Sequence, residues 1–128
     1  MRIIKTKNFS GWAVDEGVTD RTLWNAISEM EQGLIDANLG GNVYKKRVAI
    51  KKRGKRGGIR TLIATRFKGT AFFVYGFSKN TRTNISKKEL KALKMLAEQL
   101  LGYSGKGIDK AIIAGEFIEV KSDEESNS

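Results

Sequence analysis

The sequence has no cysteine and no histidine among its 128 residues. The absence of cysteine excludes disulfides, thiol catalysis and thiolate metal sites, and the absence of histidine removes the commonest general base and the commonest metal ligand. Any chemistry must therefore use Lys, Arg, Tyr, Ser, Thr or carboxylate side chains. The close acid pairs, such as Asp15-Glu16 and Glu29-Glu31, do not have the spacing of a metal site, so we expect neither a metal nor another cofactor.

Long apolar runs and nucleotide-binding motifs are also missing. No apolar segment approaches the roughly 20 residues of a transmembrane helix, and the first residues, Met1-Arg2-Ile3-Ile4-Lys5, lack the apolar region of a signal peptide. We therefore expect a cytoplasmic protein with no membrane partner. The glycines of residues 54–58 match neither a phosphate-binding loop nor a dinucleotide-binding fingerprint, so nucleotide-dependent chemistry is not indicated.

Acidic residues are absent from one long stretch of the chain. The 52 residues between Asp36 and Glu89 contain no carboxylate but 15 Lys and Arg, whereas the rest of the chain carries all 14 acids and only 9 basic residues. A region this uniformly positive attracts a polyanion, and phosphates bound there do not compete with Asp or Glu. The formal net charge of +10 makes nucleic acid the first partner to consider. The alternative is a basic surface that is simply solvated.

The hydrophobic pattern predicts one α+β domain, residues 1–120, followed by an acidic, polar segment, residues 121–128, that we expect to be disordered. Strands are expected at residues 2–6, 42–50, 59–67 and 71–77, and helices at 9–16, 20–34, 87–101 and 108–114. The expected helix signals are Asn8 or Ser10 as first N-cap, Thr19 as second, and a capping box of Ser86 with Glu89 for the helix that Gly102 ends. We therefore expect a small antiparallel sheet with the N-terminal helical pair packed on it and a C-terminal helix.

The strand that begins near Tyr44 carries the first candidate for chemistry. In a strand, Lys45 and Arg47 project from the same face about 7 Å apart, which is close enough to hold one phosphodiester and its neighbour. A neighbouring positive charge also favours the unprotonated form of a lysine, which can then act as a base where no histidine exists. The alternative is an exposed face of ordinary ammonium groups.

Two further candidates lie at strand ends. Arg60 is the first charged side chain after the paired glycines Gly57-Gly58, and its guanidinium fork matches two non-bridging oxygens of a pentacoordinate phosphorus. Lys79 and Arg82 lie between the last of the three central strands and the Leu-rich helix, a junction where sites commonly form. Two solvated cations in a loop that leads into a helix are an equally ordinary explanation.

A basic loop, residues 51–58, joins two of the expected strands and contains five Lys or Arg and three Gly. Because the loop contains only basic residues and glycines, it has no apolar side chain to bury, and its cations are expected to be available to bind RNA phosphates. The full set of candidate RNA-binding residues outside the catalytic candidates is Lys46, Lys51, Lys52, Arg53, Lys55, Arg56 and Lys79.

Taken together, these motifs resemble a RelE-type toxin of a bacterial type II toxin–antitoxin system, within the RelE/ParE/HigB superfamily. The matching motifs, in order, are Tyr44-Lys45-Lys46-Arg47, Gly58-Ile59-Arg60 at a strand start, and Lys79-Asn80-Thr81-Arg82 before the last long helix. The stretches Gly76-Phe77-Ser78-Lys79-Asn80 and Leu39-Gly40-Gly41-Asn42 resemble one RelE-like subfamily. The resemblance covers the chain to about Val120.

The resemblance implies a microbial-ribonuclease-like fold and a ribosome-dependent, metal-independent endoribonuclease. In this family the 2′-hydroxyl of the mRNA attacks the adjacent phosphate and leaves a 2′,3′-cyclic phosphate and a 5′-hydroxyl. Carried over, Lys45 and Arg47 supply or activate the base, Arg60 stabilises the phosphorane, and Arg82 holds the phosphate or assists protonation of the leaving group. The implied partners are a cognate antitoxin, mRNA on the ribosome, and ribosomal RNA, which the loop at residues 51–58 would follow.

One residue of the family pattern is missing from this chain. RelE itself has a tyrosine shortly after its second arginine that stacks on the RNA base, whereas the corresponding place here is near Ile85-Ser86. Stacking would then come from elsewhere, such as Tyr75 or Phe77 if they point into the site. Two other functions stay open: a ParE-like toxin that inhibits DNA gyrase without nuclease activity, and a non-catalytic RNA-binding domain.

Overall fold

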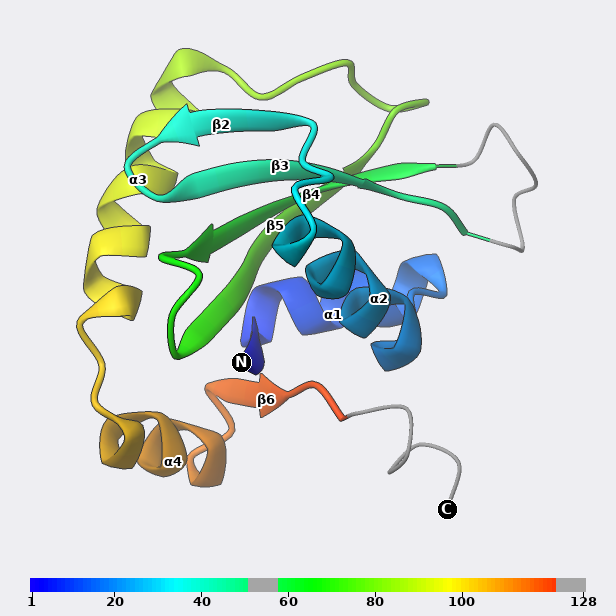
Figure 1. Cartoon of the computed structure of the whole chain (residues 1–128). Coiled ribbons are helices and arrows are strands. Elements are labelled where there is room, and N and C mark those ends of the chain that lie inside the picture. Colours follow the sequence, from blue (N-terminus) through cyan, green and yellow to red (C-terminus); the bar gives the residue numbers. More distant parts are fainter. Residues whose placement is uncertain (51–57, 122–128) are drawn as a thin grey trace.

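The computed structural model describes residues 1–50 and 58–121 (Figure 1). Along these residues the elements are β1 (Arg2–Thr6), α1 (Lys7–Glu16), α2 (Asp20–Glu31), β2 (Ala37–Gly40), β3 (Val43–Val48), β4 (Ile59–Thr65), β5 (Thr70–Ser78), α3 (Lys87–Leu101), α4 (Gly105–Ile113) and β6 (Phe117–Glu119). The expected α+β class is therefore confirmed. No helix in these two ranges is long and apolar enough to cross a membrane.

The strands form one open sheet in the order β2-β3-β4-β5-β1-β6. All neighbours run antiparallel except β1 and β5, which are parallel, with Arg2 opposite Thr70 and Lys5 opposite Phe73. The expected antiparallel sheet is thus confirmed apart from this one parallel pair. A parallel pair requires a long crossover connection, and the chain from α1 through β4 supplies it. The edge strand β2 was not expected, because its glycines indicated only the end of the helical region.

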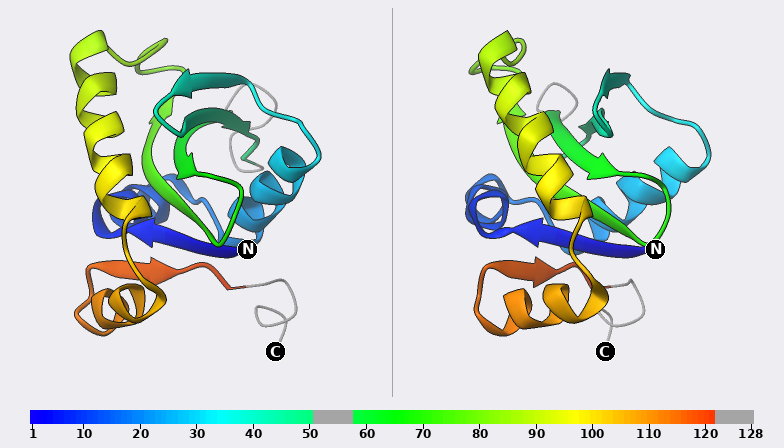
Figure 2. Two further views of the ribbon diagram at one scale, coloured as in Figure 1. Left: turned by 60° about the vertical axis from the view of Figure 1, so that its left-hand side comes forward. Right: turned by 90° about the vertical axis from the view of Figure 1, so that its left-hand side faces the viewer.

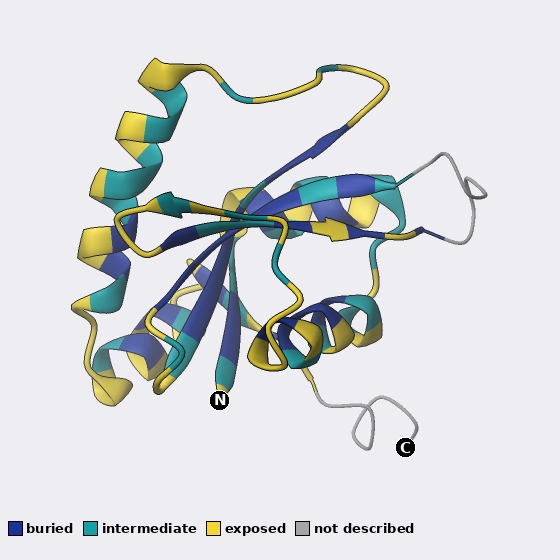
Figure 3. Ribbon diagram, turned by 45° about the horizontal axis from the view of Figure 1, so that its top comes forward, coloured by how far each residue is buried: buried dark blue, intermediate teal, exposed yellow. Residues whose placement is uncertain are grey.

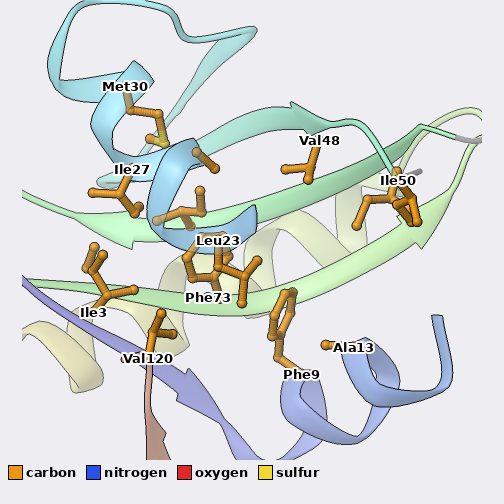
Figure 4. Packing of buried hydrophobic residues seen from close by; sticks show 14 residues of the cluster. Ile3, Phe9, Ala13, Leu23, Ile27, Met30, Val48, Ile50, Phe73 and Val120 are labelled. Atoms are coloured by element: carbon orange, nitrogen blue, oxygen red, sulfur yellow. The ribbon is translucent and has the colours of Figure 1, made fainter. Parts of the chain in front are cut away.

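Helices cover both faces of the sheet, with α2 and α3 on opposite sides of the strands (Figure 2). The first face carries α1 and α2 over a core that we call the α1–α2 cluster, which includes Phe9, Leu23, Ile27, Ile63 and Phe73 (Figure 4). The second, which we call the α3 face, carries α3 and α4 over Val43, Leu62, Phe72, Ala97 and Ile108. The central strands are buried from both sides (Figure 3). The expected C-terminal helix therefore lies on the face opposite the N-terminal helical pair.

The local signals of the helix ends are largely confirmed. Thr19 accepts a hydrogen bond from the Thr22 N–H, and Ser86 with Glu89 forms a complete capping box before Gly102 ends α3. The N-cap of α1 is Thr6 rather than Asn8 or Ser10, because β1 runs directly into the helix.

The expected end of α2 is also corrected by the structure. The helix ends at Glu31, and Gly33 then takes a positive φ of 93° that stops the helical path. Leu34, which the apolar spacing placed in the helix, is 57% exposed as a result.

Two sequence-based expectations fall outside the described residues. They are the basic loop, except for its last residue Gly58, and the acidic segment from Ser122 to the end. Lys121 is described, and its backbone N–H donates to Asp20 Oδ2 at 3.1 Å. Lys121 is therefore held at the start of α2.

Candidate active site

A row of side chains crosses three strands of the α3 face. The strand register places Arg47 of β3 opposite Arg60 of β4, and Arg60 opposite Phe77 of β5. The next row joins Lys45 and Tyr75 through Leu62. Leu62 and Tyr75 belong to the core beneath α3, and alternation along each strand brings the other members to the same face. The expected pair Lys45 and Arg47 therefore shares one face with Arg60.

This end of the α3 face is not covered by the helix. α3 crosses the opposite end of β3, where the side chain of Lys94 lies against Gly40 and Gly41 in the turn from β2. Lys45 and Arg60 are half-buried, and Arg47 is exposed. Within residues 1–50 and 58–121, none of these three cations takes part in an ion pair. The three side chains therefore present positive charge that no ion pair neutralises, although the Asp36 carboxylate accepts a hydrogen bond from the Arg47 backbone N–H.

A β-bulge decides which aromatic residues reach this face. The register between β4 and β5 shifts between Leu62, which lies opposite Tyr75, and Ile63, which lies opposite Phe73, so that β5 contains one extra residue. Phe73 packs into the α1–α2 cluster, where its ring centroid lies 5.2 Å from that of Phe9. Without the bulge, Tyr75 would point the same way as Phe73. The bulge turns Tyr75 and Phe77 onto the α3 face instead.

Lys46 lies apart from the other basic residues of β3. Its side chain points to the opposite face, is only 8% exposed, and places its Nζ 2.7 Å from Glu29 Oε1 of α2. The alternation of side chains along β3 that exposes Lys45 and Arg47 directs Lys46 toward α2. The structure therefore removes Lys46 from the candidate RNA-binding residues, whereas Lys79, exposed just after β5, stays among them.

Arg82 is held by a network at the start of α3 rather than free. Its guanidinium makes two hydrogen bonds to the Glu89 carboxylate, Nη1 to Oε2 at 2.9 Å and Nη2 to Oε1 at 2.6 Å. Its Nε donates to the Asn84 carbonyl at 2.9 Å, and its Nη1 donates to the Tyr75 hydroxyl at 3.3 Å. The group also lies over the ring of Phe77, 5.8 Å from the centroid. Four of its five N–H groups are thus in use.

The ion pair between Arg82 and Glu89 stabilises the charged form of each side chain. The hydrogen bonds from Arg82, together with that from the Ser86 N–H, lower the pKa of Glu89 to about 2. The same contact with Glu89 raises the pKa of Arg82. Sequence reasoning identified Glu89 only as part of a capping box. The signal that could have assigned it to Arg82 is that Glu89 is the first carboxylate after the 52-residue acid-free stretch.

A cleft of about 630 Å³ opens beside these residues, between α1, β5 and α3. Trp12 of α1, Tyr75, Phe77, Arg82 and Leu93 of α3 are among the residues that line it. Trp12 can lie this close to β5 because residue 76 is glycine: a Cβ there would lie only 2.1 Å from its ring. In the part of the chain that the structure describes, no three Asp or Glu side chains come together as a metal ion would require.

The family model for the RelE toxin of the RelE/RelB toxin–antitoxin system matches residues 1–120. The chain belongs to the RelE family. It is therefore a toxin of a toxin–antitoxin system, and membership implies a cognate antitoxin as its partner. A search of curated protein sequences found no match.

Proposed function

We propose that this RelE-family toxin is a ribosome-dependent endoribonuclease that cleaves mRNA without a metal ion. The observation that carries the proposal is the convergence of Lys45, Arg47 and Arg60 on one open face, where none of the three side chains is ion-paired within the described residues. Like charges directly opposite each other in neighbouring strands are destabilising, so the Arg47–Arg60 pair has a cost that a bound phosphate would remove. Cleavage of translated mRNA would take place in the cytoplasm.

The proposed reaction is an internal transesterification. The 2′-oxygen of the message forms a bond to phosphorus, its proton passes to Lys45, which acts as the base, and the bond from phosphorus to the 5′-oxygen breaks. Arg47 and Arg60 hold the non-bridging oxygens, where negative charge grows in the transition state. Lys79 and the basic residues of the loop at 51–57 would add affinity through other phosphates.

The ribosome would hold the mRNA in the arrangement that this reaction requires. Cations stabilise a phosphorane only once the 2′-hydroxyl lies in line with the leaving oxygen, and such positioning is worth roughly 7–11 kcal/mol in favourable cases. An open face with half-exposed cations does not itself impose that geometry on free RNA. A message already held in a decoding site supplies it.

The purified toxin is therefore expected to cleave mRNA on a programmed ribosome and to cleave free RNA poorly. Cleavage is measured by mapping 5′ ends, with just enough magnesium to keep ribosomes assembled while EDTA removes other divalent ions. The control is the same message without ribosomes. Efficient cleavage of free RNA that requires magnesium would contradict the proposal. In cells, a DNA-damage response without cuts inside codons would favour gyrase inhibition, and neither response would favour simple RNA binding.

Neighbouring lysines of β3 provide a matched pair of variants. Lys45→Met is expected to lower ribosome-dependent cleavage by at least about 10-fold, because it removes a group that acts in the transition state. Lys46→Met is expected to leave cleavage unchanged, since this side chain faces α2 and Glu29. Its free energy of unfolding should change by about 1 kcal/mol or less, because Glu29 is half-exposed and can be hydrated. Equal losses from both variants would show that side-chain direction along β3 does not decide function.

A further inference from the structure

The mechanism above leaves one proton unassigned, namely the one that the 5′-oxygen takes as it leaves. We infer that the Tyr75 hydroxyl donates this proton, and that Arg82 and Glu89 are positioning residues that hold the hydroxyl for it. The inference rests on the proposed nuclease function and assigns a further residue to the same site. It depends on the β5 bulge, on the hydrogen bond from Arg82 to Tyr75, and on the ion pair between Arg82 and Glu89.

Tyr75 lies where a donor is needed. The bulge in β5 turns it onto the α3 face, where it is half-buried and opposite Leu62. Arg60 lies opposite Phe77, two residues along β5, so Tyr75 and Arg60 are diagonal neighbours. Diagonal pairs in antiparallel strands are about 7–8 Å apart, within reach of an aromatic and a long side chain. A phosphate held by Arg60 would therefore lie near the phenol.

The direction of the hydrogen bond leaves the phenolic proton available. A guanidinium can only donate, so the Tyr75 oxygen must accept from Arg82 Nη1 in the 3.3 Å contact. No other side chain or backbone group in the described parts of the chain hydrogen-bonds to this hydroxyl. Its O–H can therefore point away from Arg82 toward a substrate. The other polar side chains of these two rows are that of Lys45, which the mechanism uses as the base, and the guanidinium groups of Arg47 and Arg60.

A chain of contacts fixes Arg82, and through it Tyr75, to the start of α3. Glu89 Oε1 accepts a hydrogen bond from the backbone N–H of Ser86 at 2.8 Å, which holds the carboxylate at the start of the helix. The Glu89 carboxylate in turn accepts hydrogen bonds from both Nη atoms of Arg82. Because these contacts use most of its donors, Arg82 is suited to orient Tyr75 and has little capacity left to bind a phosphate itself.

The step balances without any further reactant. As the bond from the 2′-oxygen to phosphorus forms, the bond to the 5′-oxygen breaks and its electron pair stays on that oxygen. The Tyr75 proton moves to the 5′-oxygen, and the phenolate left behind lies against the Arg82 guanidinium. Lys45 holds the proton taken from the 2′-hydroxyl. Exchange through solvent then returns a proton to Tyr75 and releases one from Lys45.

The test compares Tyr75→Phe with Tyr103→Phe in single-turnover cleavage on programmed ribosomes. Tyr103 is the matched control because it is 42% exposed and lies between α3 and α4, away from the site. Tyr75→Phe is expected to lower the rate about 100-fold, within the usual range for loss of a general acid, while ribosome binding stays the same. Tyr103→Phe is expected to cleave like the unmodified protein. Equal rates for the two variants would overturn the inference.

A second substrate separates proton donation from a merely structural role. A message with sulfur in place of the 5′-oxygen at the cleaved bond has a leaving group that needs no proton. Tyr75→Phe is expected to cleave this message at nearly the rate of the unmodified protein, whereas Arg60→Ala stays slow on both messages. A Tyr75→Phe defect that persists on the sulfur substrate would overturn the role of Tyr75. Absence of cleavage by the unmodified protein on both messages would instead refute the proposed nuclease function.

The positioning role of Glu89 has its own control. Glu89→Gln weakens the hold on Arg82, whereas Ser86→Ala weakens the helix cap and leaves the Arg82–Glu89 pair in place. Glu89→Gln is expected to slow cleavage, but to add no further loss to Tyr75→Phe, because it acts through Tyr75. The Glu89→Gln defect should also vanish on the sulfur substrate. An equal loss from Ser86→Ala, or a full additional loss in the double variant, would exclude this role.

Discussion

Replacing Arg60 by Ala is expected to abolish growth arrest by the toxin while the fold stays intact. Arg60 is half-buried at the start of β4 and has no ion partner among the described residues, so its loss should change stability by only about 0.5 kcal/mol. Losing a donor that stabilises the transition state typically lowers the rate by about 100-fold or more. Growth after induction gives the first readout, and cleavage on programmed ribosomes gives the second.

Two controls make the Arg60 result specific. Arg66→Ala removes an exposed arginine from the turn after β4, where its Nη1 donates to the Leu101 carbonyl, and it should leave growth arrest unchanged. Arg60→Lys keeps the positive charge but loses the planar fork, so it should restore only part of the rate. Undiminished growth arrest by a well-expressed Arg60→Ala protein would remove Arg60 from the site.

Replacing Phe73 by Ala is expected to cost about 3–5 kcal/mol of the free energy of unfolding. The side chain is fully buried between β5 and the N-terminal helices, in ring contact with Phe9, so its loss leaves a cavity that its neighbours cannot fill. The total free energy of unfolding of a small domain is only about 5–15 kcal/mol, so the variant should unfold at a much lower denaturant concentration than the unmodified protein. Chemical denaturation followed by tryptophan fluorescence measures the change.

The matched control for Phe73 is another large apolar residue. Ile113 at the end of α4 is 86% exposed, so Ile113→Ala should change stability by about 0.5 kcal/mol or less. Because Phe73 lies on the face opposite the candidate active site, folded Phe73→Ala protein at low temperature should cleave at the normal rate. Equal stability of the two variants would show that the α1–α2 cluster is not packed as described.

Local patterns in the sequence determined the elements and much of the chemistry. Ser86 and Glu89 identified the start of α3, because a capping box needs only residues three apart. The alternation along β3 likewise placed Lys45 and Arg47 on one face before any tertiary contact was known. The acid-free stretch indicated a polyanion partner, since net charge depends on composition alone.

Only the tertiary structure decided which basic residues share a site and which are already paired. In the sequence Lys46 cannot be distinguished from its basic neighbours, but in the structure its side chain faces α2 and forms an ion pair with Glu29. Arg82 reads as a free cation until Glu89 is found beside it. The parallel pairing of β1 with β5 and the bulge that turns Tyr75 toward Arg60 also have no local signature. Such choices depend on contacts between residues far apart in the chain, which periodicity and capping patterns do not encode.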